Sequence, residues 1–308
     1  MVDKQLWVSG NELSKWRDAA ISSAALSANV SKAEVDWLLQ EIAGLDSLAL
    51  RIGSFKEKSQ IQLKLPLQEL SKLWQERLNE NLPVQYIARS TPWRHFNIKV
   101  SPSVLIPRPE TESLIDLVIA AQSNNPTIQE GNWADLGTGS GIIALGLCSA
   151  FSKATIYAVD CSSQALSIAQ QNVHNYNLGN RIKFYQGSWW EPLNFIKGEF
   201  SGMVSNPPYI PTATLPNLQP EVFKHEPHLA LDGGDDGLEC IRHLVETSPD
   251  YLKPGGIWLI EMMAGQADKV KQMLYDNGSY SKIEIHRDLA GIERFALAYR
   301  NQELGVRN

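Results

Sequence analysis

The 308-residue sequence has little of what marks secreted or membrane-embedded proteins. Its three cysteines, Cys148, Cys161 and Cys240, show neither paired nor metal-ligand spacing, which indicates a reducing compartment. No apolar run approaches the ~20 residues that a membrane-spanning helix needs, so no membrane partner is expected. The first residues, Met1–Gln5, lack the charged-then-apolar build of a signal peptide. We therefore expect a cytoplasmic protein.

The sequence also lacks an excess of positive charge. Its net charge is −6 and its pI is near 5.6. Because binding to a phosphate backbone depends on Lys and Arg, no stable nucleic acid partner is expected. His225 and His228 are separated by a proline that interrupts helical spacing, and no metal site is expected there. The hydrophobic content of 43% and the charged content of 20% are those of an ordinary globular protein.

The most informative segment is Asn206–Tyr209, which reads Asn-Pro-Pro-Tyr and follows the apolar run Phe200–Ser205, typical of a buried strand. Neither proline has an N–H group, and each fixes its φ near −65°. A residue that precedes proline is held extended. This stiff segment presents carbonyl acceptors beside an amide side chain and an aromatic ring, which suits binding a substrate –NH2 group through both of its hydrogens. A rigid turn after a strand is the alternative interpretation.

A second motif, Asp135–Gly141, reads Asp-Leu-Gly-Thr-Gly-Ser-Gly and lies between a predicted strand and an apolar run typical of a helix. Strand, glycine turn and helix in this order predict the nucleotide-binding crevice of a doubly wound α/β domain. Because Ile142 stands where a dinucleotide fingerprint requires glycine, the spacing differs from G-x-G-x-x-G. It resembles the first motif of methyltransferases that use S-adenosylmethionine (SAM).

Two further predicted strands end in residues that suit the same ligand. One ends in Asp160, about 20 residues past the glycines, where a carboxylate can accept hydrogen bonds from a ribose diol. A role as the N-cap of the following helix is the alternative for Asp160. The other strand leads into Ser188 and Trp189, and in methyltransferases of this class that strand end lines the adenine pocket. Core packing is the alternative for Trp189, as for its neighbour Trp190.

Over residues 83–300 the sequence resembles a known family. Asn-Pro-Pro-Tyr at the end of a fourth strand is similar to methyltransferases that act on the planar amino groups of adenine, guanine or glutamine. The segments that resemble the release factor glutamine methyltransferases in particular are Val104–Glu112, Glu226–Gly234 and Asp288–Gly291. The positions that depart from the family pattern are Ser188 in place of an acidic residue, Arg89 and Ser90 in place of a glycine, and Glu261–Met263 in place of Glu-Ile-Gly.

The resemblance implies SAM-dependent methylation of the glutamine side-chain amide in the Gly-Gly-Gln motif of peptide chain release factors, with S-adenosylhomocysteine as the product. Asn206, Pro207 and Tyr209 are the predicted catalytic residues. The Asn206 side-chain oxygen and the Pro207 carbonyl would each accept one amide N–H, and Tyr209 would pack on the amide or face the sulfonium. Pro208 and Ile210 complete the predicted substrate site. The predicted cofactor-binding residues are Asp135, Gly137, Thr138, Gly139, Ser140, Gly141, Asp160, Ser188, Trp189 and Asn206.

The sequence predicts three consecutive parts: a helical domain over residues 1–88, a connector with a β-hairpin over 89–108, and a methyltransferase domain over 109–308. The resemblance implies that the helical domain is a substrate-recognition domain, and a lobe that only stabilises the fold is the alternative. The first part is expected to be all helical, because Ser31–Glu34 forms a capping box ahead of apolar residues at helical spacing. From residue 109 strands and helices alternate, which predicts an α/β fold with a mainly parallel sheet covered on both faces. The resemblance implies that this is the seven-stranded, Rossmann-like sheet of SAM-dependent methyltransferases. The final strand of this sheet is expected to be antiparallel.

Three functions remain open at this point. The leading one is release factor glutamine methylation by a monomer. A second is methylation of another –NH2 group, either a ribosomal protein glutamine or a nucleobase, and the acidic net charge disfavours the nucleobase. A third is a SAM-binding or RNA-binding module without catalysis, which would have no need of the intact Asn206–Tyr209 motif. The sequence does not identify the preferred release factor.

Overall fold

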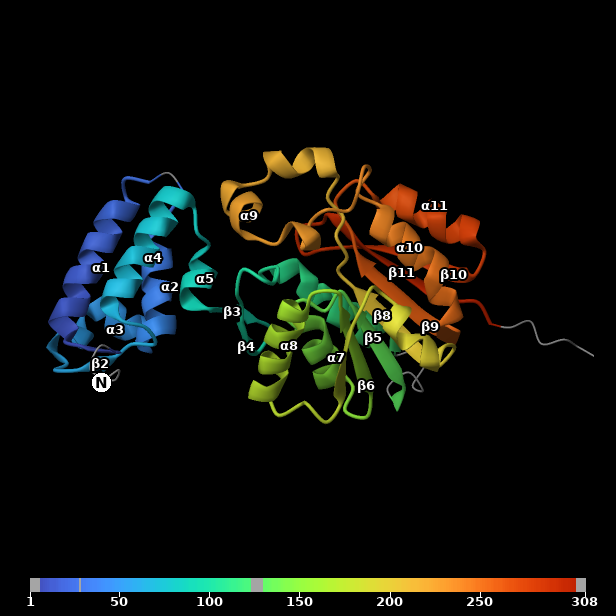
Figure 1. Ribbon diagram of the computed structural model, residues 1–308, viewed down its shortest axis with the longest axis horizontal. Coiled ribbons are helices and arrows are strands. Elements are labelled where there is room, and N and C mark those ends of the chain that lie inside the picture. The colour runs from blue at the N-terminus through green and yellow to red at the C-terminus, as the bar shows by residue number, and fades with distance from the viewer. Residues whose placement is uncertain (1–5, 28, 123–129, 303–308) are drawn as a thin grey trace, which may run out of the picture. The chain divides into compact units, whose positions relative to one another are not determined.

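The computed structural model describes residues 6–27, 29–122 and 130–302, which form two compact units (Figure 1). The first unit comprises the residues up to Thr91 together with Gln219–His225. The second comprises Pro92–Leu218 and the residues from Glu226 onward. None of the helices in the described ranges has the length and apolar character that crossing a membrane requires.

The first unit is mainly helical. Its helices are α1 (Gly10–Ala24), α2 (Lys32–Ala43), α3 (Ser47–Ile52), α4 (Leu67–Glu80), α5 (Val84–Ala88) and α9 (Pro220–His225). The predicted capping box is confirmed, since Ser31 accepts from the Glu34 backbone N–H and Glu34 accepts from the Ser31 N–H. The expectation of an all-helical part is wrong in one detail: β1 (Trp7–Val8) pairs antiparallel with β2 (Ile61–Gln62). Two-residue strands carry no readable alternation, so the sequence gives no signal for them.

A buried arginine holds α9 in the first unit. The side chain of Arg77 in α4 is 5% exposed. Its Nε donates to Glu34 at 2.8 Å, its Nη1 to Glu221 of α9 at 3.0 Å, and its Nη2 to the Asn29 carbonyl at 3.1 Å. A guanidinium this far from water is stable only when its donors are satisfied, as they are here. Residues 219–225 therefore belong structurally with a helix that precedes them by more than a hundred residues.

The second unit is built on a seven-stranded sheet with the strand order β10-β11-β9-β8-β5-β6-β7. Its strands are β5 (Asn132–Leu136), β6 (Thr155–Asp160), β7 (Ile182–Gln186), β8 (Phe200–Ser205), β9 (Leu252–Glu261), β10 (Tyr280–Arg287) and β11 (Glu293–Arg300). Its helices are α6 (Glu112–Gln122), α7 (Ile142–Ala150), α8 (Ser163–Asn175), α10 (Glu239–Thr247) and α11 (Ala267–Asn277). Strands β5 to β9 pair in parallel, whereas β11 is antiparallel to both its neighbours. The predicted sheet and its antiparallel last strand are confirmed.

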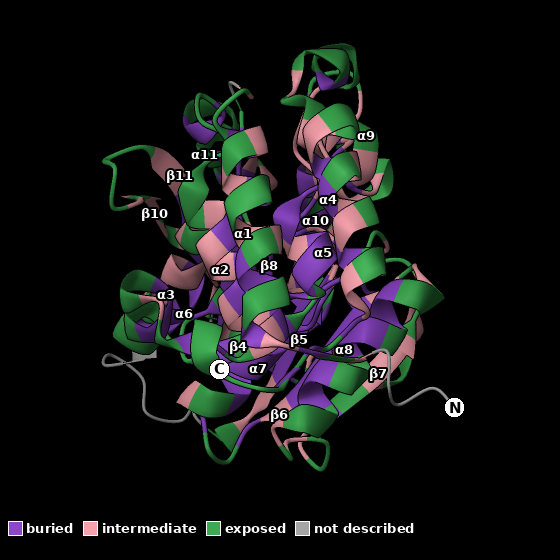
Figure 2. Ribbon diagram, turned by 90° about the vertical axis from the view of Figure 1, so that its left-hand side faces the viewer, coloured by how far each residue is buried: buried purple, intermediate pink, exposed green. Residues whose placement is uncertain are grey.

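Helices cover both faces of the sheet (Figure 1). Ala134 and Leu136 of β5 belong to the core that α10 and α11 complete, with Ile241 and Val270 among its buried residues. Trp133 lies between them in sequence and packs against Phe151 at the end of α7, with ring centroids 5.2 Å apart. Strands β5 and β8 are buried on both faces, as their purple ribbons in Figure 2 show. Continuous apolar strands of this kind are typical of a parallel sheet covered on both sides.

The predicted hairpin is present as β3 (Ser90–Trp93) and β4 (Phe96–Lys99). The buried Asn172 of α8 ties its end to the central turn of the second unit. The Lys99 backbone N–H donates to Asn172 Oδ1 at 2.7 Å, while Asn172 Nδ2 donates to the carbonyls of Lys99 and Ser140, both at 2.9 Å. This side chain thus fixes the connector against the glycine turn between β5 and α7.

Candidate active site

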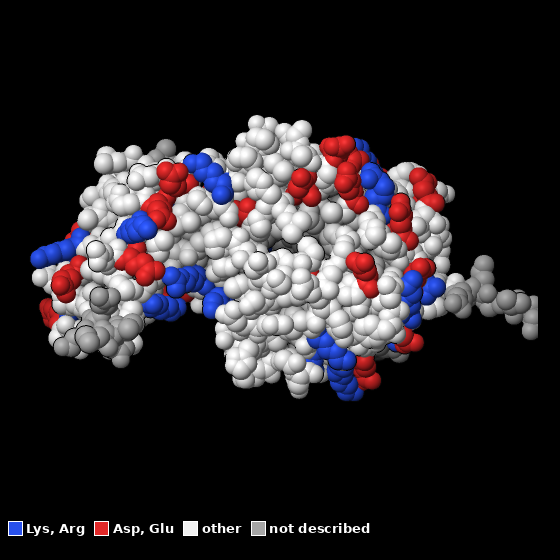
Figure 3. Space-filling model, in the orientation of Figure 1, with Lys and Arg blue, Asp and Glu red and all other residues white. Residues whose placement is uncertain are grey.

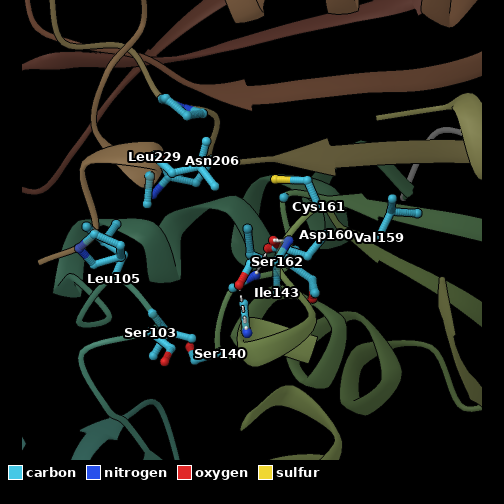
Figure 4. A pocket seen from close by; sticks show the side chains of 18 of the residues that line it. Ser103, Leu105, Ser140, Ile143, Val159, Asp160, Cys161, Ser162, Asn206 and Leu229 are labelled. Atoms are coloured by element: carbon cyan, nitrogen blue, oxygen red, sulfur yellow. Dashed lines mark hydrogen bonds between the residues drawn. The ribbon is translucent and has the colours of Figure 1, made fainter. Parts of the chain in front are cut away.

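A cavity of about 310 Å³ opens at the carboxyl ends of the parallel strands in the second unit. In open α/β sheets this edge, where the strand order reverses, is where ligands bind. Of the residues predicted from the sequence, those that line the cavity are Gly137, Thr138, Gly139, Ser140, Asp160, Ser188, Trp189, Asn206 and Pro208. Asp135, Gly141, Pro207, Tyr209 and Ile210 are not among the residues that line it. Figure 4 shows Asn206 beside Leu229, with Asp160 and Ser162 facing the same space.

The glycine turn forms one wall of the cavity. Gly137 and Gly139 have φ of 77° and 53°, in the left-handed region that disfavours other residues. The N–H groups of Gly137 and Thr138 both donate to the Val159 carbonyl at 2.9 Å, which ties the turn to the end of β6. A Cβ added at Gly139 would meet no atom within 4 Å, so it is the backbone conformation that requires glycine there. The open space over Gly139 leaves its backbone accessible to a ligand.

Asp160 follows the turn at the end of β6. Its Oδ2 accepts from the Gly139 N–H and its Oδ1 from the Ser162 N–H, both at 2.9 Å. Burial raises the pKa of this carboxyl group, and the two backbone hydrogen bonds oppose that rise. Helix α8 has Ser162 as its N-cap, whose hydroxyl accepts from the Ala165 N–H. The alternative in which Asp160 caps this helix is therefore wrong.

Asp135 lies beneath the turn, fully buried. Its Oδ2 accepts from the Thr138 hydroxyl at 2.5 Å and from the Ala144 N–H at 2.9 Å. Its Oδ1 has no hydrogen-bond partner among the described residues. Burial raises the pKa of Asp135 to about 7. Asp135 therefore stabilises the turn through Oδ2, while Oδ1 can still accept a hydrogen bond.

The two adjacent tryptophans occupy different environments. Trp190 is 2% exposed, stacks on Tyr251 with ring centroids 4.5 Å apart, and donates its indole N–H to Ser248 at 2.9 Å. Trp189 lines the cavity beside Gly137, with an unusual positive φ of 49°. Core packing is therefore the explanation for Trp190. Trp189 is partly buried, packs against the same core cluster and also lines the cavity. Ser188 is exposed at the same strand end.

The Asn206–Tyr209 motif begins where β8 ends. Ser205 anchors it by donating from its hydroxyl to the Leu136 carbonyl of β5 at 2.6 Å. The Asn206 side chain faces the cavity and donates from Nδ2 to the Thr111 hydroxyl at 3.3 Å. Tyr209 turns away from the cavity, and its hydroxyl donates to Glu261 Oε1 at 3.1 Å. Ile210 pairs through its backbone with Leu231 and Gly233 of the downstream Glu226–Gly234 segment.

Sequence reasoning missed the residues that support this motif. Glu261, fully buried at the end of β9, accepts from the Thr111 hydroxyl at 2.7 Å as well as from Tyr209. Burial raises the pKa of Glu261 to about 7. Glu226 likewise accepts from the Ile106 N–H at 3.0 Å and from the Arg108 guanidinium, and Arg108 lines the cavity. For Glu261, the sequence did contain one indication of a role at the site, namely an acidic residue at the end of an apolar strand.

Comparisons with known proteins agree with this architecture. The family model described as "Methyltransferase small domain" matches residues 116–235. A release factor glutamine methyltransferase of Synechocystis sp. is 50% identical over 293 residues, which are 95% of this chain and 97% of that protein. Another, of Thermosynechococcus vestitus, is 49% identical over 265 residues, covering 86% of this chain and 90% of that protein. The solved hMettl16 catalytic domain in complex with MAT2A 3′UTR hairpin 6 has a TM-score of 0.52 at 16% identity, covering 79% and 84% of the two chains. This last likeness concerns the fold alone.

Proposed function

This chain belongs to the release factor glutamine methyltransferase family, and from that premise we propose that it transfers a methyl group from SAM to glutamine in peptide chain release factors. The target is the side-chain amide nitrogen in the Gly-Gly-Gln motif, and the action supports translation termination. The observation that carries this proposal is the shared cavity. Asn206, from the motif that suits a planar –NH2 group, and the turn over Gly137–Gly139 line the same 310 Å³ space. A methyl donor on the turn and an amide at Asn206 would meet there.

The residues present suit SAM in size and chemistry. Asp160 has a carboxylate at a strand end and would accept from the ribose hydroxyls. Trp189 offers an aromatic surface to the adenine, and the exposed Ser188 offers a hydroxyl to its amino group. The unpaired Oδ1 of Asp135 lies beneath the turn and would accept from a ligand donor or a bridging water there. When bound, SAM supplies an electrophilic methyl group on a sulfonium centre.

The chain's own contribution to catalysis is to position the substrate nitrogen. An amide nitrogen is a poor nucleophile, because its lone pair is delocalised into the carbonyl. We propose that Asn206 Oδ1 and the Pro207 carbonyl each accept one N–H of the substrate amide, which holds the nitrogen for in-line attack. No backbone N–H among the described residues donates to the Pro207 carbonyl, and proline provides none of its own. As positive charge develops on the nitrogen both hydrogen bonds strengthen, so they stabilise the transition state more than the ground state.

Proton loss follows attack and needs no dedicated base. Bound SAM would supply the methyl group for the new N–C bond and would take the electron pair of the broken C–S bond, giving S-adenosylhomocysteine. The alkylated nitrogen then carries an acidic proton, which one of the two carbonyl acceptors can pass to solvent. Tyr209 is 3.1 Å from Glu261 through its hydroxyl, and burial beside that carboxyl group raises the pKa of the phenol. Tyr209 therefore stays protonated at neutral pH, and we assign it to the support of the motif.

The first unit is the proposed site of protein recognition. It has its own core, formed by buried side chains such as Leu13, Leu38, Phe55 and Trp74. Contacts between this unit and a folded release factor would supply binding energy away from the reacting amide. That energy would hold the release factor while its Gly-Gly-Gln loop enters the cavity. A short Gly-Gly-Gln peptide would then be methylated slowly, because it makes no contact with this unit.

Two other substrates stay open as outcomes of the test. A ribosomal protein glutamine presents the same chemical group. A nucleobase presents a similar planar amine, but on the face drawn in Figure 3 Lys and Arg side chains are interspersed with Asp and Glu. Mixed charge of this kind, with a net charge of −6, does not favour a phosphate backbone.

Incubation of the full-length protein with labelled SAM and a cell lysate tests the proposal. Label is expected in release factors and in no nucleic acid. Label in a ribosomal protein or in RNA, with release factors unlabelled, would establish one of the alternatives. Binding of SAM without any transfer would indicate a module without catalysis.

A further inference from the structure

A buried hydrogen-bond network lies behind the Asn206–Tyr209 motif and joins it to β9. It comprises Glu261, Thr111, Tyr209 and Asn206. Thr111 comes from the 3₁₀ helix Pro109–Thr111 and is 1% exposed, while Glu261 is fully buried. The distances are 2.7 Å from Thr111 Oγ1 to Glu261 Oε2, 3.1 Å from the Tyr209 hydroxyl to Glu261 Oε1, and 3.3 Å from Asn206 Nδ2 to Thr111 Oγ1. The motif is thus connected to a carboxyl group that does not itself line the cavity.

The chemistry of the members gives this network a direction. An ionised carboxylate only accepts hydrogen bonds, so Thr111 and Tyr209 must both donate to Glu261. The single hydroxyl proton of Thr111 is then committed, and its oxygen can only accept from Asn206. Asn206 must therefore present Nδ2 to Thr111, which directs Oδ1 the other way. Asn206 lines the cavity, where that oxygen can accept from a substrate.

We propose that Glu261 is a positioning residue that acts through Thr111 to fix the Asn206 amide with its oxygen toward the substrate nitrogen. This inference rests on the proposed function, since it gives Asn206 Oδ1 the role of acceptor. A flipped amide would present Nδ2 to the substrate –NH2, so that two donors would face each other. A fixed orientation avoids that arrangement and saves the reorganisation of the acceptor during the reaction.

The orientation depends on the ionisation of Glu261. A protonated Glu261 donates from one oxygen, which frees the Thr111 proton to donate to a flipped Asn206 Oδ1. Burial is the main cause of the raised pKa of Glu261, about 7, and the hydrogen bonds from Thr111 and Tyr209 oppose it. The other charged groups that act on Glu261 are Glu110, which raises its pKa, and Arg294 of β11, which lowers it. Arg294 is held by Asp288, with Nε 2.7 Å from Oδ2. The turnover rate should therefore rise with pH through about 7 as Glu261 ionises.

Two substitutions in the full-length protein test this role. Thr111→Val keeps the side-chain shape but removes the relay, and should lower kcat about 10- to 100-fold, the usual loss for a supporting partner. Thr111→Ser retains the hydroxyl and should restore kcat to within about threefold of wild type. Glu261→Gln should lower kcat above pH 8 and abolish the rise of kcat through pH 7, because the amide does not titrate. The Kd for SAM, measured by calorimetry, should stay within about threefold in all three variants.

Matched controls separate positioning from general loss of structure. Thr247→Val removes an exposed hydroxyl that donates only to the His243 carbonyl, and Glu199→Gln neutralises an exposed carboxylate 3.8 Å from Lys253. Neither should change kcat or its pH profile. Wild-type kcat and an unchanged pH profile in Thr111→Val would overturn the inference while leaving the proposed function intact. An equal loss in the Val and Ser variants, with SAM binding retained, would likewise show that the hydroxyl relay is not what matters. If the wild-type protein methylates no release factor at all, the proposed function fails instead.

Discussion

Replacing Glu261 by glutamine should flatten the dependence of folding stability on pH. Burial raises the pKa of Glu261 from 4.5 to about 7 in the folded protein. In the unfolded chain it titrates near its ordinary value, so the folded state binds more protons between these two pKa values. The free energy of unfolding therefore falls as pH rises through this window. Integrating the two titrations from pH 5 to pH 8.5 gives a loss of about 2.5 kcal/mol from this one group, most of it below pH 7.

The measurement is denaturant unfolding of wild type and Glu261→Gln across that pH range, monitored by a spectroscopic signal that reports on the second unit. Asp135, which is also buried with a pKa raised to about 7, destabilises both proteins alike as it ionises. The difference between the two proteins therefore isolates Glu261. Between pH 5 and pH 8.5, the free energy of unfolding of wild type should fall by about 2.5 kcal/mol more than that of the variant. For a unit of this size, this corresponds to roughly 5–10 °C in melting temperature. A difference that is constant over the whole range would refute the assignment of a buried, titrating carboxyl group.

Three further changes have separate expected outcomes. Asn206→Ala should lower kcat about 100-fold, or ~3 kcal/mol, and leave the Kd for SAM within about tenfold, because it removes an acceptor used in the transition state; a variant that keeps most of its kcat would exclude Asn206 from the mechanism. Asp160→Ala should weaken SAM binding by about 1.5–3 kcal/mol in calorimetry, the value of hydrogen bonds to a charged acceptor; unchanged affinity would exclude the ribose role. Arg77→Ala leaves Glu34 and Glu221 without their partner and should destabilise the first unit by about 3 kcal/mol in thermal unfolding. The same variant should raise KM for a whole release factor and leave the affinity for SAM unchanged. An unchanged KM there would count against recognition by the first unit.

The fold was largely predictable from the sequence because the second unit obeys simple rules. The apolar run Phe200–Ser205 coincides with β8, and strand, glycine turn and helix follow one another at Asp135–Gly141. Parallel strands buried on both faces are continuous apolar runs, so they were readable as strands, whereas their order in the sheet was not predicted. The boundaries at residues 88 and 108 stay predictions. The chain's return to the first unit at 219–225 was not readable, since it depends on Arg77 and Glu221 being brought together by folding.

The candidate site was predictable where backbone geometry dictates residue type, and unpredictable where long-range contacts decide. The backbone conformation requires glycine at positions 137 and 139, and this turn lines the same cavity as Asn206 and Pro208. Glu261 and Thr111 are 150 residues apart, and nothing in their local sequence indicates that they meet. The orientation of Tyr209 toward Glu261, away from the cavity, follows from the same contact.

Localisation of the transferred methyl group by mass spectrometry tests the central claim most directly. The full-length protein, SAM and a purified, folded release factor are incubated together, and the release factor is then digested and fragmented. We predict one methyl group on the side-chain amide nitrogen of the glutamine in the Gly-Gly-Gln motif, lost when the protein carries Asn206→Ala. A release factor left unmodified under conditions in which the protein methylates a ribosomal protein or a nucleobase would contradict the account.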